Sequence, residues 1–396
     1  MDQNDDARRL DRRAFFKTTG AATAAVAMTR PEPAIAQGLS EKGRLERIAG
    51  CTWPIRSLFK TRARSGAGAP ARTGDSAGAP LAAVPAVPAN RDQTTSAQMK
   101  ERYGEITMLD FPQWTKDNFP GVTRMDLFSG LFGDVSDDTM YITAGEGGGG
   151  GAGFDPMSAS GRKWLDRLAN KLVTTGTKVQ HISNNAPFGL ADYGTPEADA
   201  RRKAGVAMAK RWLEGCAVLN AKSMRMNSPQ ALGPSIRPNA IPRSGDGYPR
   251  NLDIVPLMDA AIESYKEMAD FGGNLGIKVT FENHWGLAAD PMILRIMIDT
   301  INHPYCDATP DFCNWEHEYM LFNGLKALAP YATSNVHAKY WDRWGDKNDV
   351  QRSVRIMLAG GFKGTFALEY EAGPLNGVEG AKYLYKEVLA ALTTAA

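Results

Sequence analysis

Four residues that can bind a divalent metal stand at matching places in the last third of this 396-residue chain. Glu282, Asp311, His337 and Glu369 each end a short run of strand-like composition, and stretches with helical spacing separate these runs by about thirty residues. The four runs are residues 277–282, 306–311, 332–337 and 364–369. In a (β/α)8 barrel the carboxyl ends of the parallel strands converge on one mouth, where such barrels carry their chemistry. Two glutamates, one aspartate and one histidine would form an oxygen-rich site suited to Mn²⁺, Mg²⁺, Co²⁺ or Zn²⁺.

The rest of the chain supplies the other elements that such a barrel needs. Strands are expected at residues 48–53, 122–127, 178–183 and 223–227, and helices at 164–173, 196–218 and 257–271. Together with the four runs, this alternation predicts eight parallel strands with right-handed helical crossovers. We therefore expect an α/β protein with a (β/α)8 TIM barrel, as a single domain over residues 37–396. A doubly wound open sheet is the alternative, although no G-x-G-x-x-G follows an expected strand.

The first 36 residues have the pattern of an export signal. Arg12 and Arg13 precede a weakly apolar, alanine-rich stretch, and Ala34-Ile35-Ala36 offers small residues to a signal peptidase. The pattern predicts a twin-arginine signal peptide at residues 1–36, the twin-arginine export machinery as a partner, and a periplasmic or secreted protein. A disordered basic tail or a membrane anchor is the alternative. The apolar stretch is shorter than the roughly 20 residues that a spanning helix needs, so stable membrane insertion is not expected.

Composition narrows the class of protein further. Residues 60–95 are rich in Ala, Gly, Pro and Arg, which predicts a low-complexity disordered insertion in the barrel domain. The formal net charge is only +2, and a nucleic-acid-binding protein usually carries a strongly basic face, so nucleic acid is not expected as a partner. The four cysteines do not form a metal-ligand spacing. The sequence leaves the oligomeric state open, with a homo-oligomer as one option.

Several stretches resemble a known family. Residues 275–284, 311–314, 328–339 and 361–371 are similar to the sugar phosphate isomerase/epimerase superfamily, whose members have a xylose-isomerase-like barrel. The resemblance implies one divalent metal ion, often Mn²⁺, held by Glu282, Asp311, His337 and Glu369. It also implies that Glu282 and Glu369 exchange protons with the substrate carbon. Glu371, two residues after Glu369, is the alternative for the last ligand.

The chemistry of such a site favours one reaction class and leaves others open. Removing a proton next to a carbonyl needs a base near the carbon and a Lewis acid on the oxygens. We therefore expect a sugar isomerase or epimerase that acts by proton transfer through a metal-bound enediolate on a small, non-phosphorylated carbohydrate. A metal-dependent lyase or hydratase that cleaves keto-glycosides is the close alternative. An apurinic-type endonuclease and a non-catalytic sugar-binding barrel are remote alternatives.

Other residues around the expected mouth are candidates for substrate binding. Each of them has a structural role as an alternative, such as an ion pair or a satisfied core histidine. For Asp126, on the second expected strand, substrate contact and structural pairing are equally open. The substrate-binding candidates are Arg225, His284, Lys339, Trp285 and His181.

Overall fold

The structure is a computed structural model that describes residues 39–62, 88–142, 153–187, 190, 194–226, 254–284 and 286–394. The expected signal peptide at 1–36 and most of the expected insertion at 60–95 lie outside these residues, and both stay predictions. None of the helices in the described ranges is long and apolar enough to cross a membrane.

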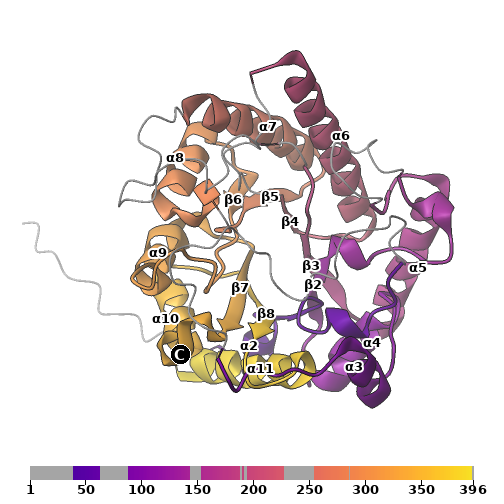
Figure 1. The fold of residues 1–396 in the computed structure, drawn as a ribbon, viewed down its shortest axis with the longest axis vertical. Helices are drawn as coiled ribbons and strands as arrows, with labels where there is room; N and C mark the ends of the chain where they lie inside the picture. Colours follow the sequence, from indigo (N-terminus) through magenta and orange to yellow (C-terminus); the bar gives the residue numbers. More distant parts are fainter. Residues whose placement is uncertain are drawn as a thin grey trace, which may run out of the picture. The chain divides into compact units, whose positions relative to one another are not determined.

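Eight parallel strands form the centre of the described part of the chain, and helices surround them (Figure 1). The strands are β1 (Ile48–Cys51), β2 (Arg124–Phe128), β3 (Lys178–Ser183), β4 (Ser223–Arg225), β5 (Lys278–Phe281), β6 (Cys306–Ala308), β7 (Asn335–Trp341) and β8 (Thr365–Ala372). They pair in the order β6-β5-β4-β3-β2-β1-β8-β7. The end strands β6 and β7 meet through a parallel bridge between Asp311 and His337, which closes the ring. The expected α/β barrel is confirmed.

The helices follow the strands in alternation. They are α2 (Glu41–Leu45), α3 (Ser96–Tyr103), α4 (Phe111–Asn118), α5 (Ala159–Thr175), α6 (Pro196–Val218), α7 (Val255–Asn274), α8 (Pro291–Ile301), α9 (Met320–Leu328), α10 (Val350–Ala359) and α11 (Gly377–Thr394). Local sequence explains their ends: Thr195 caps α6 and is followed by Pro196, and Gly176 ends α5 in the left-handed conformation. In α10 the buried residues Val350, Val354 and Met357 follow helical spacing and face the sheet side.

The strands differ from their expected bounds where the ligands lie. Glu282 directly follows β5, as expected, but β6 already ends at Ala308 and Asp311 lies beyond it. Pro310 explains this end, because proline has no backbone N–H to extend a ladder. His337 and Glu369 lie inside β7 and β8 rather than at their ends. These two strands pair with each other from Asn335 to Trp341, which extends both past the expected bounds.

The inside of the barrel is unusually polar. Side chains two residues apart on a strand share a face, so Thr280, Thr309 and Asn335 lie on the same face as the ligands that follow them two positions later. All three are fully buried, and the hydroxyl oxygens of Thr280 and Thr309 are 2.6 Å apart. TIM barrels are usually filled by branched apolar residues at such positions. In this barrel, hydrogen-bonded polar side chains occupy the layer next to the four expected ligands.

The described end of the expected insertion contacts the carboxyl ends of β7 and β8. Arg91 forms two hydrogen bonds with Asp342, Nε to Oδ2 at 2.8 Å and Nη2 to Oδ1 at 2.5 Å. The backbone N–H of Asp92 donates to the carbonyl of Gly373 at 2.7 Å. Thr95 then caps α3. Residues 88–95 are thus placed by an ion pair and by backbone contacts.

Candidate metal centre

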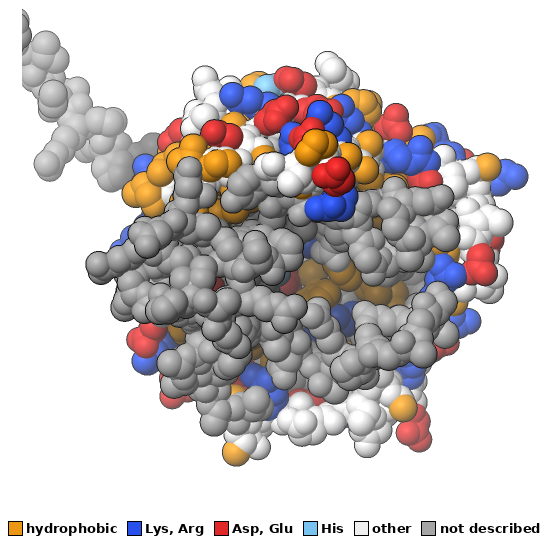
Figure 2. Space-filling model, turned by 45° about the horizontal axis from the view of Figure 1, so that its top comes forward, with side chains coloured by type: hydrophobic (Ala, Val, Ile, Leu, Met, Phe, Trp, Pro, Cys, Tyr) orange, Lys and Arg blue, Asp and Glu red, His pale blue; other side chains and the backbone are white. Residues whose placement is uncertain are grey.

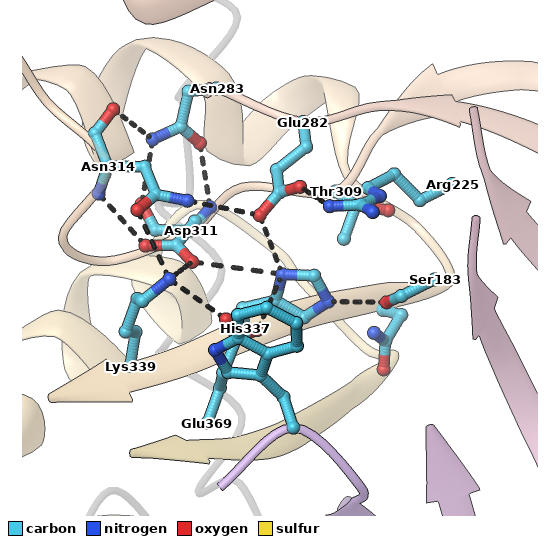
Figure 3. Close-up of polar contacts among 12 residues, drawn as sticks. Ser183, Arg225, Glu282, Asn283, Thr309, Asp311, Asn314, His337, Lys339 and Glu369 are labelled. Carbon is cyan, nitrogen blue, oxygen red and sulfur yellow. Dashed lines mark hydrogen bonds and ion pairs between the residues drawn. The ribbon is translucent and has the colours of Figure 1, made fainter. Parts of the chain in front are cut away.

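The four expected ligands meet inside the barrel, with Glu282 and Asp311 after β5 and β6 and with His337 and Glu369 within β7 and β8 (Figure 3). Each of Glu282, Asp311, His337 and Glu369 offers one donor atom, and these atoms all lie within 4.8 Å of one another. All four residues are buried, with exposed fractions of 7% or less. Three carboxylates and one imidazole in this arrangement match the donors that divalent cations take in proteins.

Asp311 is placed by two asparagines and a turn. Its backbone N–H donates to Asn283 Oδ1 at 2.7 Å, and Asn283 Nδ2 donates back to its carbonyl at 2.9 Å. The carboxylate oxygen Oδ1 accepts from the N–H groups of Cys313 and Asn314 at 2.7 and 2.9 Å. The other oxygen, Oδ2, is buried and accepts no hydrogen bond among the described residues. Lys339 Nζ lies 3.4 Å from this oxygen, and a buried carboxylate oxygen without a hydrogen bond in this donor set fits a cation ligand.

The two glutamates are held alike. Glu282 Oε1 lies 2.9 Å from His337 Nδ1, and Oε2 accepts a short hydrogen bond from Arg225 Nη1. Glu369 Oε2 lies 3.1 Å from the same nitrogen, and Oε1 accepts from Lys339 Nζ at 2.9 Å. Each glutamate therefore turns one oxygen toward the donor set and binds a cationic side chain with the other.

His337 has different neighbours at its two nitrogens. Nδ1 faces Glu282, Glu369 and, at 3.8 Å, Asp311 Oδ2. Nε2 lies 3.1 Å from Asp126 Oδ2 and 3.3 Å from Ser183 Oγ. Nδ1 is thus the nitrogen that belongs to the donor set.

Lys339 is the central cation of the cluster. Its Nζ lies 2.9 Å from Glu369, 3.2 Å from Glu371 and 3.4 Å from Asp311. Glu371 lies outside the four-donor group and accepts a hydrogen bond from Trp53 Nε1 at 2.7 Å. This geometry favours Glu369 over Glu371 as the fourth ligand, and the assignment stays a prediction.

Burial and charge shift the protonation of the cluster. The pKa of Asp311 is raised to about 7. Burial is the main cause of this rise, the charge of Lys339 opposes it, and the charges of Glu369 and Glu282 add to it. Burial would lower the pKa of His337, but the carboxylates of Glu369 and Glu282 outweigh it and raise that pKa well above its ordinary value. Without a metal, Asp311 and His337 therefore both hold protons readily.

The neighbouring groups are kept in their charged forms. Burial would raise the pKa of Glu282, but the charge of Arg225 and that of His337 hold it well below its usual range. Burial would lower the pKa of Lys339, but the charges of four carboxylates raise it well above its ordinary value. The pKa of Asp126 falls to about 2 because the imidazoles of His181 and His337 outweigh its burial.

The other substrate-binding candidates lie at different depths. Arg225 and Lys339 contact the ligands directly. His284 is half-buried, and burial lowers its pKa to about 4. His181 is fully buried, beside Asp126 in the sheet register, and its Nδ1 lies 2.7 Å from Ser223 Oγ. Trp285 lies outside the described residues, so its role stays a prediction.

Sequence reasoning missed the residues that orient the ligands. Neither Asn283 nor Asn314 was expected to act, although one follows Glu282 directly and the other stands three residues after Asp311. Asn314 Nδ2 donates to Glu282 Oε1 at 3.2 Å, and Asn314 Oδ1 accepts from Lys339 at 3.2 Å. An asparagine soon after a ligand was the available signal, because its side chain can hydrogen-bond nearby backbone groups.

Comparison with solved structures finds barrels of low sequence identity. A xylose isomerase-like TIM barrel protein from Mycobacterium smegmatis, in complex with magnesium, is 16% identical with a TM-score of 0.48, over 74% of this chain and 90% of that one. A 3-keto-D-glucoside 4-epimerase from E. coli is 15% identical with a TM-score of 0.48, over 73% and 94%. An L-ribulose 3-epimerase is 12% identical with a TM-score of 0.49, over 72% and 89%. Comparison with curated proteins finds no match.

Comparison with family models gives the assignment. The model described as xylose isomerase-like TIM barrel matches residues 150–393, which is 244 of the 396 residues. The matched range contains all four residues of the donor set and Lys339. The resemblance noted in the sequence is thereby confirmed. The chain belongs to the xylose isomerase-like TIM barrel family.

Proposed function

We propose that this protein is a divalent-metal-dependent isomerase or epimerase that moves a proton on a non-phosphorylated sugar or sugar derivative. The observation that carries this proposal is the paired arrangement of Glu282 and Glu369. They come from β5 and β8, on opposite sides of the ligands from β6 and β7, and each has its second oxygen on a cation. Two such carboxylates can remove a proton on one side of a carbon and return it on the other.

A divalent cation fits the donor set that the chain provides. Glu282, Asp311, His337 and Glu369 would hold it, and the buried Oδ2 of Asp311, which accepts no hydrogen bond among the described residues, supports that fit. When bound, the cation would act as a Lewis acid on neighbouring carbonyl and hydroxyl oxygens and so favour an enediolate. Mn²⁺ is the ion we expect first, with Mg²⁺, Co²⁺ and Zn²⁺ as alternatives.

The cationic side chains that pair with Glu282 and Glu369 hold these two proposed bases in place. Arg225 holds Glu282 ionised, and Lys339 holds one oxygen of Glu369 by a hydrogen bond. An ionised and oriented carboxylate can accept a proton from a carbon without first losing its own. Return of the proton to the opposite face gives an epimer, and return to the adjacent carbon gives an isomer.

The charge of the site favours an uncharged substrate. With Asp311 ionised and His337 neutral, as metal binding requires, five carboxylates (Asp126, Glu282, Asp311, Glu369 and Glu371) face three cations (Arg56, Arg225 and Lys339), which leaves a formal charge of −2. One divalent cation would cancel this charge. Each of the three cations is already paired with a carboxylate, so a phosphate group would have to compete for it.

On the face shown in Figure 2, acidic and basic side chains are interspersed over the described surface.

Export would agree with a substrate of this kind. The twin-arginine signal that we expect at residues 1–36 would carry the folded protein to the periplasm or outside the cell. Free sugars and glycosides, rather than cytosolic sugar phosphates, would be the substrates met there. Detecting the cleaved protein in the periplasmic or secreted fraction, and its loss after Arg12→Lys/Arg13→Lys substitution, tests this part.

The test of the reaction is proton exchange in deuterated water. The purified protein, loaded with Mn²⁺, is incubated with free ketoses, aldoses and keto-glycosides, and products are followed by NMR. We expect deuterium next to the carbonyl together with an epimer or isomer, and loss of both in Glu282→Gln and Glu369→Gln. The control is Glu267→Gln on α7, which removes an exposed pair with Lys210 on the outside of the barrel.

Two outcomes would contradict the proposal. Release of an aglycone from keto-glycosides would show the lyase reaction instead. Absence of deuterium exchange with every sugar tested, in protein shown to contain the metal, would rule out proton transfer on these substrates.

A further inference from the structure

A second group of donor atoms lies beneath the four-ligand set. Asp126, His181 and His337 offer atoms within 4.8 Å of one another, all buried. A second cation is one interpretation of this group. However, His337 would have to supply both its nitrogens to cations, and the oxygens of Asp126 already accept hydrogen bonds. The contacts of Asp126 indicate a different role, which rests on the metal centre of the proposed function.

His337 can ligate a cation only through a nitrogen that carries no proton. Nδ1 is the nitrogen that faces Glu282 and Glu369, at 2.9 and 3.1 Å. For Nδ1 to offer its lone pair, the proton of the neutral imidazole must be on Nε2. The group that accepts a hydrogen bond from Nε2 therefore selects the tautomer that can bind a metal.

Asp126 is that acceptor. Its Oδ2 lies 3.1 Å from His337 Nε2, and the exposed fraction of Asp126 is 0%. A carboxylate has no proton to donate, so once a cation takes the place of a proton on Nδ1, this contact requires Nε2–H as the donor. Ser183 Oγ, the other neighbour of Nε2 at 3.3 Å, is itself committed as a donor to Asp126 Oδ1 at 2.9 Å. Both contacts of Nε2 thus agree with the Nε2–H tautomer that a cation on Nδ1 requires.

A chain of hydrogen bonds holds Asp126 in turn. Asn335 Nδ2 donates to Asp126 Oδ2 at 2.9 Å, and Thr365 Oγ1 donates to Asn335 Oδ1 at 2.7 Å. Because the carboxylate of Asp126 can only accept, it fixes the amide of Asn335 with Nδ2 toward Asp126, and the hydroxyl of Thr365 donates to the other end of that amide. Asn335 and His337 are two residues apart on β7 and share its inner face. The carboxylate is therefore held from three sides and cannot turn away from the imidazole without losing hydrogen bonds.

We propose that Asp126 is a positioning residue of the metal centre, which holds His337 in the tautomer and orientation that present Nδ1 to a divalent cation. Loss of such an outer partner of a metal-binding histidine typically weakens metal affinity roughly 10- to 100-fold. Asp126→Asn keeps the size of the side chain but replaces the anionic acceptor by a neutral amide. We expect the affinity of this variant for Mn²⁺ or Co²⁺ to be roughly 10- to 100-fold weaker than that of the wild type.

The test measures metal affinity without any substrate. Dissociation constants are obtained by chelator competition for wild type, Asp126→Asn and Asp307→Asn, with the Co²⁺ absorption spectrum and the thermal stability of the metal-free proteins. Asp307→Asn is the matched control, because Asp307 is a buried aspartate of strand β6 that contacts Lys278 and Thr333 instead of His337. We expect only Asp126→Asn to weaken metal binding and to change the Co²⁺ spectrum.

Each result decides a different point. Wild-type affinity in Asp126→Asn, or equal weakening in both variants, would overturn the positioning role. A wild-type protein that binds no divalent cation would overturn the metal centre itself, whereas one that binds the cation but moves no proton would overturn only the proposed reaction.

A measurement on the wild-type protein covers the case in which Asp126→Asn does not fold. Protein labelled with ¹⁵N-histidine and loaded with Zn²⁺ or Mg²⁺ gives separate signals for its five histidines, and His337→Asn identifies one of them. Nitrogen shifts that show a protonated Nε2 and an unprotonated Nδ1 support the proposal. A protonated Nδ1 in the loaded protein would overturn it.

Discussion

Raising the pH from 6 to 8 should tighten the binding of a divalent cation to this protein. Two of the four ligands hold protons readily when no metal is present, because burial raises the pKa of Asp311 and neighbouring carboxylates raise that of His337. A cation must displace these protons before it can use the oxygen and the nitrogen. Protons are scarcer at higher pH, so the apparent affinity for the cation should rise.

The size of the effect follows from the pKa of Asp311. With a pKa of about 7, this carboxyl is mostly protonated at pH 6 and mostly ionised at pH 8. Its proton alone should therefore make the apparent affinity about tenfold tighter at pH 8, equivalent to about 1.4 kcal/mol. His337 acts in the same direction and adds up to about tenfold per pH unit for as long as it remains protonated.

The stability of the metal-free protein should change in the opposite direction. The folded pKa of Asp311 is about 7, above its ordinary value of 3.8, so the folded state binds more protons than the unfolded state between these values. Stability from this group is present at low pH and is lost as the pH rises from about 4 to 7. His337 likewise loses its contribution as the pH rises through its raised pKa. Added metal should therefore raise the melting temperature more at pH 8 than at pH 6.

Calorimetry and chelator competition measure these quantities. Titration with Mn²⁺ at pH 6 in two buffers of different ionisation enthalpy counts the protons released, and we expect between one and two per cation. Asp307→Asn is the control, since it alters a buried aspartate outside the donor set and should retain the pH dependence of the wild type. An affinity that is unchanged or weaker at pH 8, or binding at pH 6 without proton release, would refute this reasoning.

Three substitutions test the charges around the ligands. Glu369→Gln should weaken Mn²⁺ binding at least about tenfold and Glu371→Gln less than about threefold, so chelator competition shows which glutamate is the ligand. Arg225→Met leaves Glu282 buried without its cation and should lower the free energy of unfolding by about 3–5 kcal/mol, measured with urea; an unchanged value would mean that the pair is not needed. Lys339→Met removes the cation shared by three carboxylates, so added Mn²⁺ should raise the melting temperature more than in the wild type, and an equal or smaller rise would count against this role.

The barrel and the meeting of four ligands could be predicted because both depend on local patterns. Alternation of strand and helix spacing sets the order of elements, and parallel strands bring their carboxyl ends together. The expected helix at 196–218 and the strand at 178–183 agree with α6 and β3. The places of His337 and Glu369 within longer strands could not be predicted in the same way. The lengths of β7 and β8 depend on how many residues they pair with each other.

Local spacing patterns could not predict which side chains from distant strands would contact one another. Asp126 and His337 are 211 residues apart, and their hydrogen bond depends on how the strands lean across the barrel. The sequence left Asp126 open between substrate contact and structural pairing. The partners of Lys339 were likewise not predictable, because its three carboxylates come from the segment after β6 and from β8. Period-two spacing indicated the face on which Lys339 lies but not which partners would reach it.

The bridge between Asp311 and His337 means that two of the expected metal ligands also lie where the barrel closes. Backbone hydrogen bonds join the segment after β6 to β7: the N–H of His337 donates to the carbonyl of Pro310 at 2.9 Å, and the N–H of Phe312 donates to the carbonyl of His337 at 3.2 Å. A cation held by Asp311 and His337 would thus fasten the seam at which the sheet closes on itself. Without it, amide hydrogens beside this seam should exchange sooner than those of β1 and β2, and the parted strands would expose two edges that can pair with another chain. Metal supply would then govern the solubility of the barrel as well as its chemistry.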